Sequence, residues 1–260
     1  MKTLLITGGS SGIGKATVEL FVAHGWFVYE LSRHGVSQDH VTHIDCDVTQ
    51  AVSVHQAVAA VLEQAKQVDV VISNAGFGIS GAIEFAREED VRRQMDVNFM
   101  GAVHLTQAVL PYLRTQARGT IIYTSSVAAT LSVPYQAFYS ASKAAINAMA
   151  LALANEVRPF GIHVSVLMPG DVSTGFTAAR AKSEDGAAVY TNIHHAVSAM
   201  EKDELGGMSP RQMAQCFWRI ANKRNPAPQY VGGGIYKVLC FLDRLLPKRL
   251  VNWIEGQMYS

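Results

Sequence analysis

Long apolar runs are missing from this chain, and no stretch reaches the ~18 apolar residues that a membrane span needs. Cysteine is scarce as well. The three cysteines are scattered without metal-ligand spacing, which argues against a disulfide framework and favours a reducing, cytoplasmic setting. A strong charge of either sign is also lacking. The formal net charge is only +1, so the composition gives no reason to expect a nucleic-acid partner.

Apolar residues are plentiful by contrast, and they make up 49% of the 260 positions, enough for a sizeable core. Short apolar runs alternate with longer amphipathic segments along the chain. This alternation predicts an α/β fold in which a doubly wound parallel sheet (Rossmann fold) has helices on both faces. We expect one domain over residues 1–260.

A glycine-rich stretch, Thr7-Gly8-Gly9-Ser10-Ser11-Gly12-Ile13-Gly14, follows the first apolar run and precedes an amphipathic segment. Such a loop lets backbone N–H groups approach a phosphate, and the helix dipole adds to the attraction. The longer dinucleotide signature G-x-G-x-x-G fails, because Thr17 stands in place of its third glycine. The P-loop signature fails at Ala16, where a hydroxyl would hold Mg²⁺, so nucleotide hydrolysis is a disfavoured alternative.

Tyr139 and Lys143 lie four residues apart in a segment, Gln136 to Val157, that is rich in helix-forming residues. On a helix this spacing places both side chains on one face. An ammonium beside a phenol favours the phenolate and lowers its pKa from ~10. The pair therefore suits acid/base chemistry, although the same spacing occurs by chance on many surface helices.

An ordered set of short motifs resembles the short-chain dehydrogenase/reductase family. In chain order the set comprises Thr7 with Gly8-x-x-x-Gly12-x-Gly14, Asp47-Val48, Asn74-Ala75-Gly76, Asn98, Ser126, Tyr139-x-x-x-Lys143 and Pro169-Gly170. Each motif is weak alone, but their order and spacing over the chain are specific. The stretch from Asn225 to Gly232, followed by Leu245-Leu246-Pro247, resembles the hydroxysteroid-dehydrogenase-like branch of that family, which suggests a lipophilic ketone or alcohol.

The resemblance implies that Asn98, Ser126, Tyr139 and Lys143 are catalytic. Ser126 stands thirteen positions before Tyr139, as in the family, and Ser125 is the alternative by proximity. Ser126 and Tyr139 would hold a carbonyl, Tyr139 would transfer the proton, and Lys143 would lower the tyrosine pKa and hold the nicotinamide ribose. Asn98 would kink its helix, expected at Glu88 to Leu113, and hold a water in a proton relay. A buried asparagine bonded to backbone is the alternative.

The resemblance also implies an NADP(H) site. Its residues would be Gly8, Ser10, Ser11, Gly12, Ile13, Gly14, Arg33, Asp47, Val48, Asn74, Ala75, Gly76, Tyr139, Lys143, Pro169, Gly170, Val172 and Thr174. Arg33 occupies the place where an arginine can meet the 2′-phosphate of NADP, whereas Glu30 and Ser11 keep NAD open. Asp47 would accept the adenine amine, cap the following helix, or do both.

Together these features predict an NADP(H)-dependent oxidoreductase, without a metal, that interconverts a lipophilic ketone and a secondary alcohol. A non-catalytic NADP(H)-binding sensor is the alternative. Residues 175–208 are expected to form a substrate lid, and residues 234–260 a helical tail. The tail would cover the cavity or a partner subunit; docking at a membrane surface is the other reading. By family analogy, the helices that carry Asn98 and Tyr139 would pair in a homo-oligomer.

Overall fold

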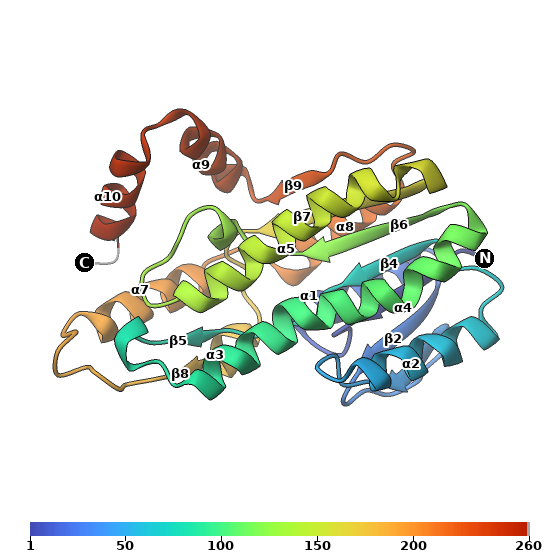
Figure 1. Ribbon diagram of the computed structural model, residues 1–260, viewed down its shortest axis with the longest axis horizontal. Coiled ribbons are helices and arrows are strands. Elements are labelled where there is room, and N and C mark those ends of the chain that lie inside the picture. Colours follow the sequence, from blue (N-terminus) through green and yellow to red (C-terminus); the bar gives the residue numbers. More distant parts are fainter. Residues whose placement is uncertain (259–260) are drawn as a thin grey trace.

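A seven-stranded parallel sheet runs through the computed structural model, which describes residues 1–258 (Figure 1). Its strand order is β3-β2-β1-β4-β6-β7-β9. The strands are β1 (Thr3–Thr7), β2 (Phe27–Ser32), β3 (Val41–Asp45), β4 (Val70–Ser73), β6 (Gly119–Thr124), β7 (Ile162–Pro169) and β9 (Gln229–Gly232). Two further strands, β5 (Ile79–Ser80) and β8 (Ala181–Lys182), pair with each other apart from this sheet. The predicted doubly wound α/β fold is confirmed.

The central strands are apolar without alternation because both faces of the sheet are covered. Every residue of β1 and of β4 is buried. A strand buried on both faces reads as a short continuous apolar run, as Leu4-Leu5-Ile6 does. The continuous apolar runs therefore predicted the positions of the strands, but they did not predict which strands pair with one another.

Helices cover the sheet on both sides. One hydrophobic cluster joins the sheet to α2, α4 and α5 through residues such as Val54, Leu105 and Ile146; the opposite cluster joins it to α1 and α8 through Phe21 and Phe217. The helices are α1 (Gly12–Ala23), α2 (Ala51–Gln64), α3 (Glu88–Met95), α4 (Gly101–Gln116), α5 (Ala137–Glu156), α6 (Phe176–Ala179), α7 (Ile193–Leu205), α8 (Pro210–Ala221), α9 (Gly234–Leu245) and α10 (Lys248–Met258).

The strand order reverses between β1 and β4. From β1 the chain continues to β2 and β3 on one side, and from β4 it continues to β6, β7 and β9 on the other. The connections after β1 and β4 therefore diverge and leave a crevice at the carboxyl ends of these strands, where open α/β sheets bind their ligands.

The long helical segment expected from Glu88 to Leu113 is interrupted at Asn98. A π-helical turn, η2 (Asp96–Met100), separates α3 from α4. Such a turn carries an extra residue and redirects the helix, and it is a frequent feature of functional sites. The expected helix is thus interrupted at Asn98, while a change in its direction there stays a prediction.

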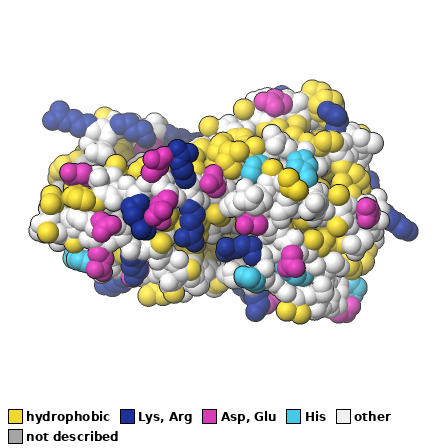
Figure 2. All heavy atoms as spheres, turned by 60° about the horizontal axis from the view of Figure 1, so that its bottom comes forward, with side chains coloured by type: hydrophobic (Ala, Val, Ile, Leu, Met, Phe, Trp, Pro, Cys, Tyr) yellow, Lys and Arg dark blue, Asp and Glu magenta, His cyan; other side chains and the backbone are white. Residues whose placement is uncertain are grey.

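The C-terminal tail consists of two helices rather than one. Leu246 and Pro247 separate α9 from α10, which begins at Lys248, because proline cannot continue a helix. Figure 1 shows α9 and α10 together at one end of the molecule, where α9 follows β9. Within residues 1–258, none of the helices has the length and apolar character needed to cross a membrane. On the face shown in Figure 2, acidic and basic side chains are interspersed.

Candidate active site

A cavity of about 1720 Å³ lies at the carboxyl ends of the central strands. It extends from the glycine loop and the end of β2, past the ends of β4, β6 and β7, to α5, α7 and the two tail helices. All the residues predicted for the site line it except Gly14 and Asn98. The fold thus brings together motifs spread over more than 160 positions of the sequence.

The glycine loop is shaped for close backbone approach. Gly8 and Gly12 have φ angles of +66° and +52°, which L side chains rarely adopt. Gly14 lies behind the loop, where a Cβ would come within 2.0 Å of the Gly8 carbonyl oxygen. The loop leads directly into α1, whose N-terminal dipole favours an anionic group. These features fit the diphosphate of a dinucleotide.

Asn74 joins the loop to the neighbouring strands. Its Nδ2 donates to the Gly8 carbonyl over 3.1 Å, and its backbone N–H donates to Thr7 Oγ1 over 3.1 Å. Its Oδ1 accepts from Thr124 Oγ1 over 3.2 Å. One asparagine therefore ties together the ends of β1, β4 and β6, and the Asn-Ala-Gly turn supports the sheet as the sequence predicts.

Glu30 does not face the cofactor groove. It is buried, and its Oε1 accepts the Gly9 backbone N–H over 2.9 Å. Its Oε2 lies 2.6 Å from His43 Nδ1 and accepts from Ser32 Oγ over 3.2 Å. Both carboxylate oxygens are therefore engaged in holding the glycine loop against β2 and β3, a role that the sequence alone did not reveal.

Arg33, by contrast, is exposed and lines the cavity, and it has no ion-pair partner among residues 1–258. Asp47 also lines the cavity, but its Oδ1 accepts from the backbone N–H and the hydroxyl of Thr49, at 2.9 and 2.8 Å. The expectation that Asp47 caps the next helix is wrong: α2 begins at Ala51 with Gln50 as N-cap and has no side-chain cap.

Tyr139 lies in the cavity and is hydrogen-bonded to Ser126. Burial of the phenol raises its pKa to about 12, against the smaller lowering effect of the Ser126 hydrogen bond. Ser125 points elsewhere, since its Oγ donates to the backbone carbonyl of Lys143 over 3.0 Å. The geometry thus places Ser126, rather than Ser125, beside the tyrosine.

Lys143 is 4% exposed, and its Nζ donates to the Thr124 carbonyl over 2.9 Å. The same Nζ lies 5.7 Å from the centroid of the Tyr139 ring. Burial lowers the pKa of Lys143 to about 8. The expectation that the tyrosine pKa lies below its usual value is wrong in this geometry, because the loss of water around the phenol outweighs the lowering effects of Ser126 and Arg180.

Asn98 is 1% exposed, and both the nitrogen and the oxygen of its side-chain amide are hydrogen-bonded. Its Nδ2 donates to the Phe77 carbonyl and to Ser142 Oγ, each over 3.0 Å, and its Oδ1 accepts the Phe77 N–H over 3.0 Å. These are the contacts of the backbone-bonded alternative. A Cβ on Gly76 would lie 3.2 Å from Asn98 Oδ1 and 3.3 Å from Lys143 Nζ, so both polar groups flank the same glycine. The water relay stays a prediction.

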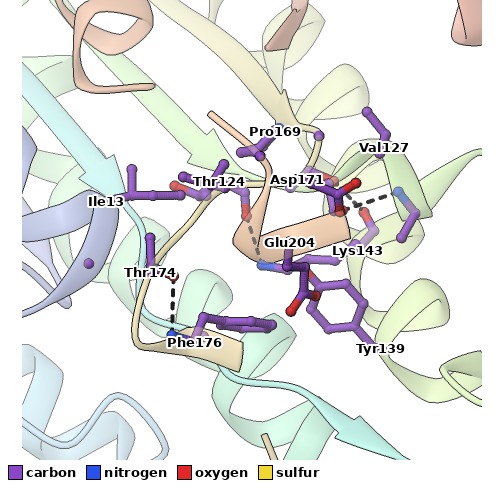
Figure 3. A pocket seen from close by; sticks show the side chains of 18 of the residues that line it. Ile13, Thr124, Val127, Tyr139, Lys143, Pro169, Asp171, Thr174, Phe176 and Glu204 are labelled. Atoms are coloured by element: carbon purple, nitrogen blue, oxygen red, sulfur yellow. Dashed lines mark hydrogen bonds between the residues drawn. The ribbon is translucent and has the colours of Figure 1, made fainter. Parts of the chain in front are cut away.

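Two carboxylates near Tyr139 went unnoticed in the sequence. Glu204, from α7, accepts from Thr177 Oγ1 over 2.6 Å and pairs with the buried guanidinium of Arg180; Asp171 accepts from the Tyr236 hydroxyl. Figure 3 shows both carboxylates in the pocket with Tyr139. Burial raises the pKa of Asp171, and the neighbouring carboxylates raise it further. Asp171 directly follows the Pro169-Gly170 motif, whereas no motif marks Glu204, which reaches the cavity only because α7 folds against it.

Apolar side chains of the C-terminal tail form one wall of the cavity. From α9 to α10 they are Ile235, Leu239, Leu242, Leu246, Val251 and Ile254. Phe176, whose ring centroid lies 5.8 Å from that of Tyr139, adds an apolar surface from the predicted lid. The cavity therefore combines the polar groups around Tyr139 with an apolar extension.

Comparisons with known proteins agree with this arrangement. The family model described as short chain dehydrogenase matches residues 2–185. A 3-ketodihydrosphingosine reductase of Bacteroides thetaiotaomicron is 41% identical over 99% of this chain and 97% of its own length. A probable short-chain type dehydrogenase/reductase of Helicobacter pylori is 28% identical over 97% of this chain and 94% of its own.

Among solved structures, a short-chain dehydrogenase from Streptomyces avermitilis superposes with a TM-score of 0.84 and is 29% identical. The superposition covers 98% of this chain and 97% of the other. The likeness therefore extends over the sheet and beyond the stretch that the family model matches.

The role of Glu30 leads to a prediction about stability. Glu30→Ala leaves the Gly9 N–H and His43 without their buried acceptor, so we expect the free energy of unfolding to fall by about 1–3 kcal/mol. Urea unfolding followed by circular dichroism measures the change. The matched control is Glu19→Ala on α1, an exposed glutamate whose loss should change the free energy by less than about 0.5 kcal/mol. Equal urea midpoints for the two variants would contradict the role given to Glu30.

Proposed function

This chain belongs to the short-chain dehydrogenase/reductase family, and we propose that it reduces a long-chain amino ketone with NADPH. Family membership makes it an oxidoreductase that uses NAD(P)(H). The observation that carries the finer proposal is the composition of the cavity beyond Tyr139, where carboxylates stand next to the catalytic centre and an apolar wall continues from it.

The catalytic step follows from the positions of three side chains. The substrate carbonyl oxygen accepts hydrogen bonds from Ser126 and Tyr139. A reduced nicotinamide bound in the groove would supply the hydride that the carbonyl carbon accepts. Tyr139 gives its proton to the oxygen, and its high pKa keeps the phenol protonated at neutral pH, which suits the direction of reduction. The Lys143 ammonium, oriented by the Thr124 carbonyl, stabilises the phenolate that the proton transfer leaves.

The residues around the groove fit NADPH. The glycine loop would hold the diphosphate, Asp47 and Val48 the adenine, and the turn from Pro169 to Thr174 the nicotinamide. Arg33 would meet the 2′-phosphate. An acid that would select the ribose 2′-hydroxyl of NAD is not free at this place, because Glu30 is bound to Gly9 and His43. This engagement of Glu30 favours NADPH over NADH.

The substrate side favours a cationic, lipophilic ketone. Asp171, Asp203 and Glu204 line the cavity, and within residues 1–258 only Glu204 has an ion-pair partner. An ammonium group next to the ketone would compensate these charges, and an alkyl chain would lie along the tail helices. The relative named 3-ketodihydrosphingosine reductase supports this choice, since 3-ketodihydrosphingosine is a long-chain amino ketone. We further propose that residues 175–208, which supply Glu204 and Phe176, act as the lid over it.

A cofactor sensor without catalysis is the second candidate. It would need the dinucleotide groove but not an acid held next to it. Ser126, Tyr139 and Lys143 together in one cavity therefore favour the enzyme. The pairing of α4 and α5 in a homo-oligomer stays a prediction.

The first test uses 3-ketodihydrosphingosine and NADPH, with NADPH oxidation followed by absorbance. We expect turnover by the parent protein, and a loss of about a thousandfold or more in kcat for Tyr139→Phe with NADPH binding retained, because the ring stays and the proton is removed. The N-acetylated ketone, which lacks the ammonium, should react with a higher KM. Turnover by Tyr139→Phe at the parent rate, or equal KM for the two ketones, would contradict the mechanism or the substrate class respectively.

Cofactor preference depends on Arg33. Arg33→Ala should weaken NADPH binding about 10- to 100-fold and leave NADH binding unchanged, because only NADPH carries the phosphate that pairs with the guanidinium. Fluorescence titration of each reduced cofactor gives the two dissociation constants. Arg224→Ala removes an exposed arginine that does not line the cavity and should alter neither. Unchanged NADPH affinity in Arg33→Ala would refute the assignment.

The lysine sets the pH dependence of reduction. Since burial lowers the pKa of Lys143 to about 8, the ammonium is lost as the pH rises through that value. We expect kcat/KM for reduction to be level below about pH 8 and to fall about tenfold per pH unit above it. Lys143→Arg keeps its charge throughout this range, so its slower reaction should lack that alkaline limb. An unchanged limb in Lys143→Arg would assign the titration to another group.

A further inference from the structure

The tail helices α9 and α10 carry exposed apolar side chains that do not pack into the interior of the protein. Among residues 1–258, seventeen large hydrophobic side chains are exposed, and eight of them lie on α9 and α10. Four of the eight do not line the cavity and are more than half exposed: Val238, Phe241, Leu245 and Trp253. A surface patch of this kind in a folded protein marks an interaction site.

The exposed side chains on α9 form one stripe. Val238, Phe241 and Leu245 recur at helical spacing and fall on one face, whereas Cys240 and Asp243 on the opposite face are buried. The helix is therefore apolar on two sides, one against the protein and one against the surroundings. We call the outward side, with Trp253 of α10, the tail stripe.

Every exposed charge around the tail stripe is positive. Lys237, Arg244, Lys248 and Arg249 are exposed, while Asp243 is buried and Glu255 is partly buried. Lys248 reaches Asp243 over 2.5 Å, and the other three cations have no acidic partner within residues 1–258. Apolar and aromatic side chains bordered by lysine and arginine are the composition of helices that lie in the headgroup region of anionic membranes.

The same helices form the apolar wall of the cavity. Leu242 and Ile254 are exposed in part and also line the cavity that contains Tyr139. The outer surface of the tail is thus continuous with the interior wall. A lipid chain leaving a bilayer at the tail would remain in contact with apolar side chains on its way to the catalytic centre.

We propose that α9 and α10 dock the protein on the surface of an anionic lipid bilayer, with the tail stripe in the headgroup region and the mouth of the cavity toward the lipid. A second copy of the chain is a poorer occupant, because a symmetric pairing would bring two sets of unpaired cations together. Docking rests on the tail alone; only the delivery of a lipophilic ketone from the bilayer rests on the proposed function.

The test is sedimentation of the full chain with vesicles of phosphatidylcholine, alone or with about 30% phosphatidylglycerol. We expect strong binding to the anionic vesicles and weak binding to the neutral ones. Val238→Glu/Phe241→Glu/Leu245→Glu should reduce binding by at least about tenfold, since it places charges in the stripe. Lys237→Gln/Arg249→Gln should weaken binding to anionic vesicles about fivefold for each charge removed.

The matched control is Val52→Glu on α2, a similarly exposed valine far from the tail in sequence, which should bind vesicles as the parent does. Circular dichroism and NADPH binding should be the same in all variants, since none of the changed residues lines the cavity. Absence of parent binding to anionic vesicles, or equal binding by the triple variant, would overturn the proposal. A dimer in the absence of vesicles that the triple variant converts to monomer would also overturn it, and would assign the stripe to a second copy. Sedimentation measures binding without turnover, so the vesicle results can be interpreted even if the proposed reaction is not observed.

Discussion

The hydrogen bonds of Asn74 join the three strand ends on which the site is built. The crevice exists because the strand order reverses between β1 and β4, but a reversal alone leaves two diverging loops. Asn74 holds the Gly8 carbonyl and accepts from Thr124, so the glycine loop and the end of β6 keep a fixed separation. Thr124 in turn holds the Lys143 ammonium through its carbonyl. The groove and Lys143 thus share one support.

Burial decides the electrostatics of this site more than any single charge. It raises the pKa of Tyr139 and lowers that of Lys143, so the phenol keeps its proton and the lysine comes close to losing its own. A protonated phenol beside an ammonium is the state needed to give a proton to a carbonyl oxygen. The same loss of water acts on Asp171, whose raised pKa would be reversed by a bound ammonium group. One physical effect therefore shifts the pKa values of Tyr139, Lys143 and Asp171.

The tail gives the cavity its chemical character. The rest of the cavity presents polar groups, among them Asp171 and Glu204. The two helices close it with leucine, isoleucine and valine and turn a second apolar side outward. The proposed lipophilic substrate inside and the proposed lipid surface outside would both follow from this pattern, in which α9 is apolar toward the cavity and along the tail stripe.

Local sequence was enough to predict the fold and most of the residues that line the cavity. Continuous apolar runs between helical segments specify a buried parallel sheet, and glycines at fixed spacing specify a loop that backbone sterics allow to few other residues. The tertiary structure decided what depends on distant partners. In the folded chain Glu30 is hydrogen-bonded to Gly9 and His43, so Arg33 rather than Glu30 remains free to contact a cofactor. The tertiary structure reversed the expected shift at Tyr139 through burial, and it placed Glu204 and the tail at the cavity, because residues far apart in sequence meet only after the sheet has formed.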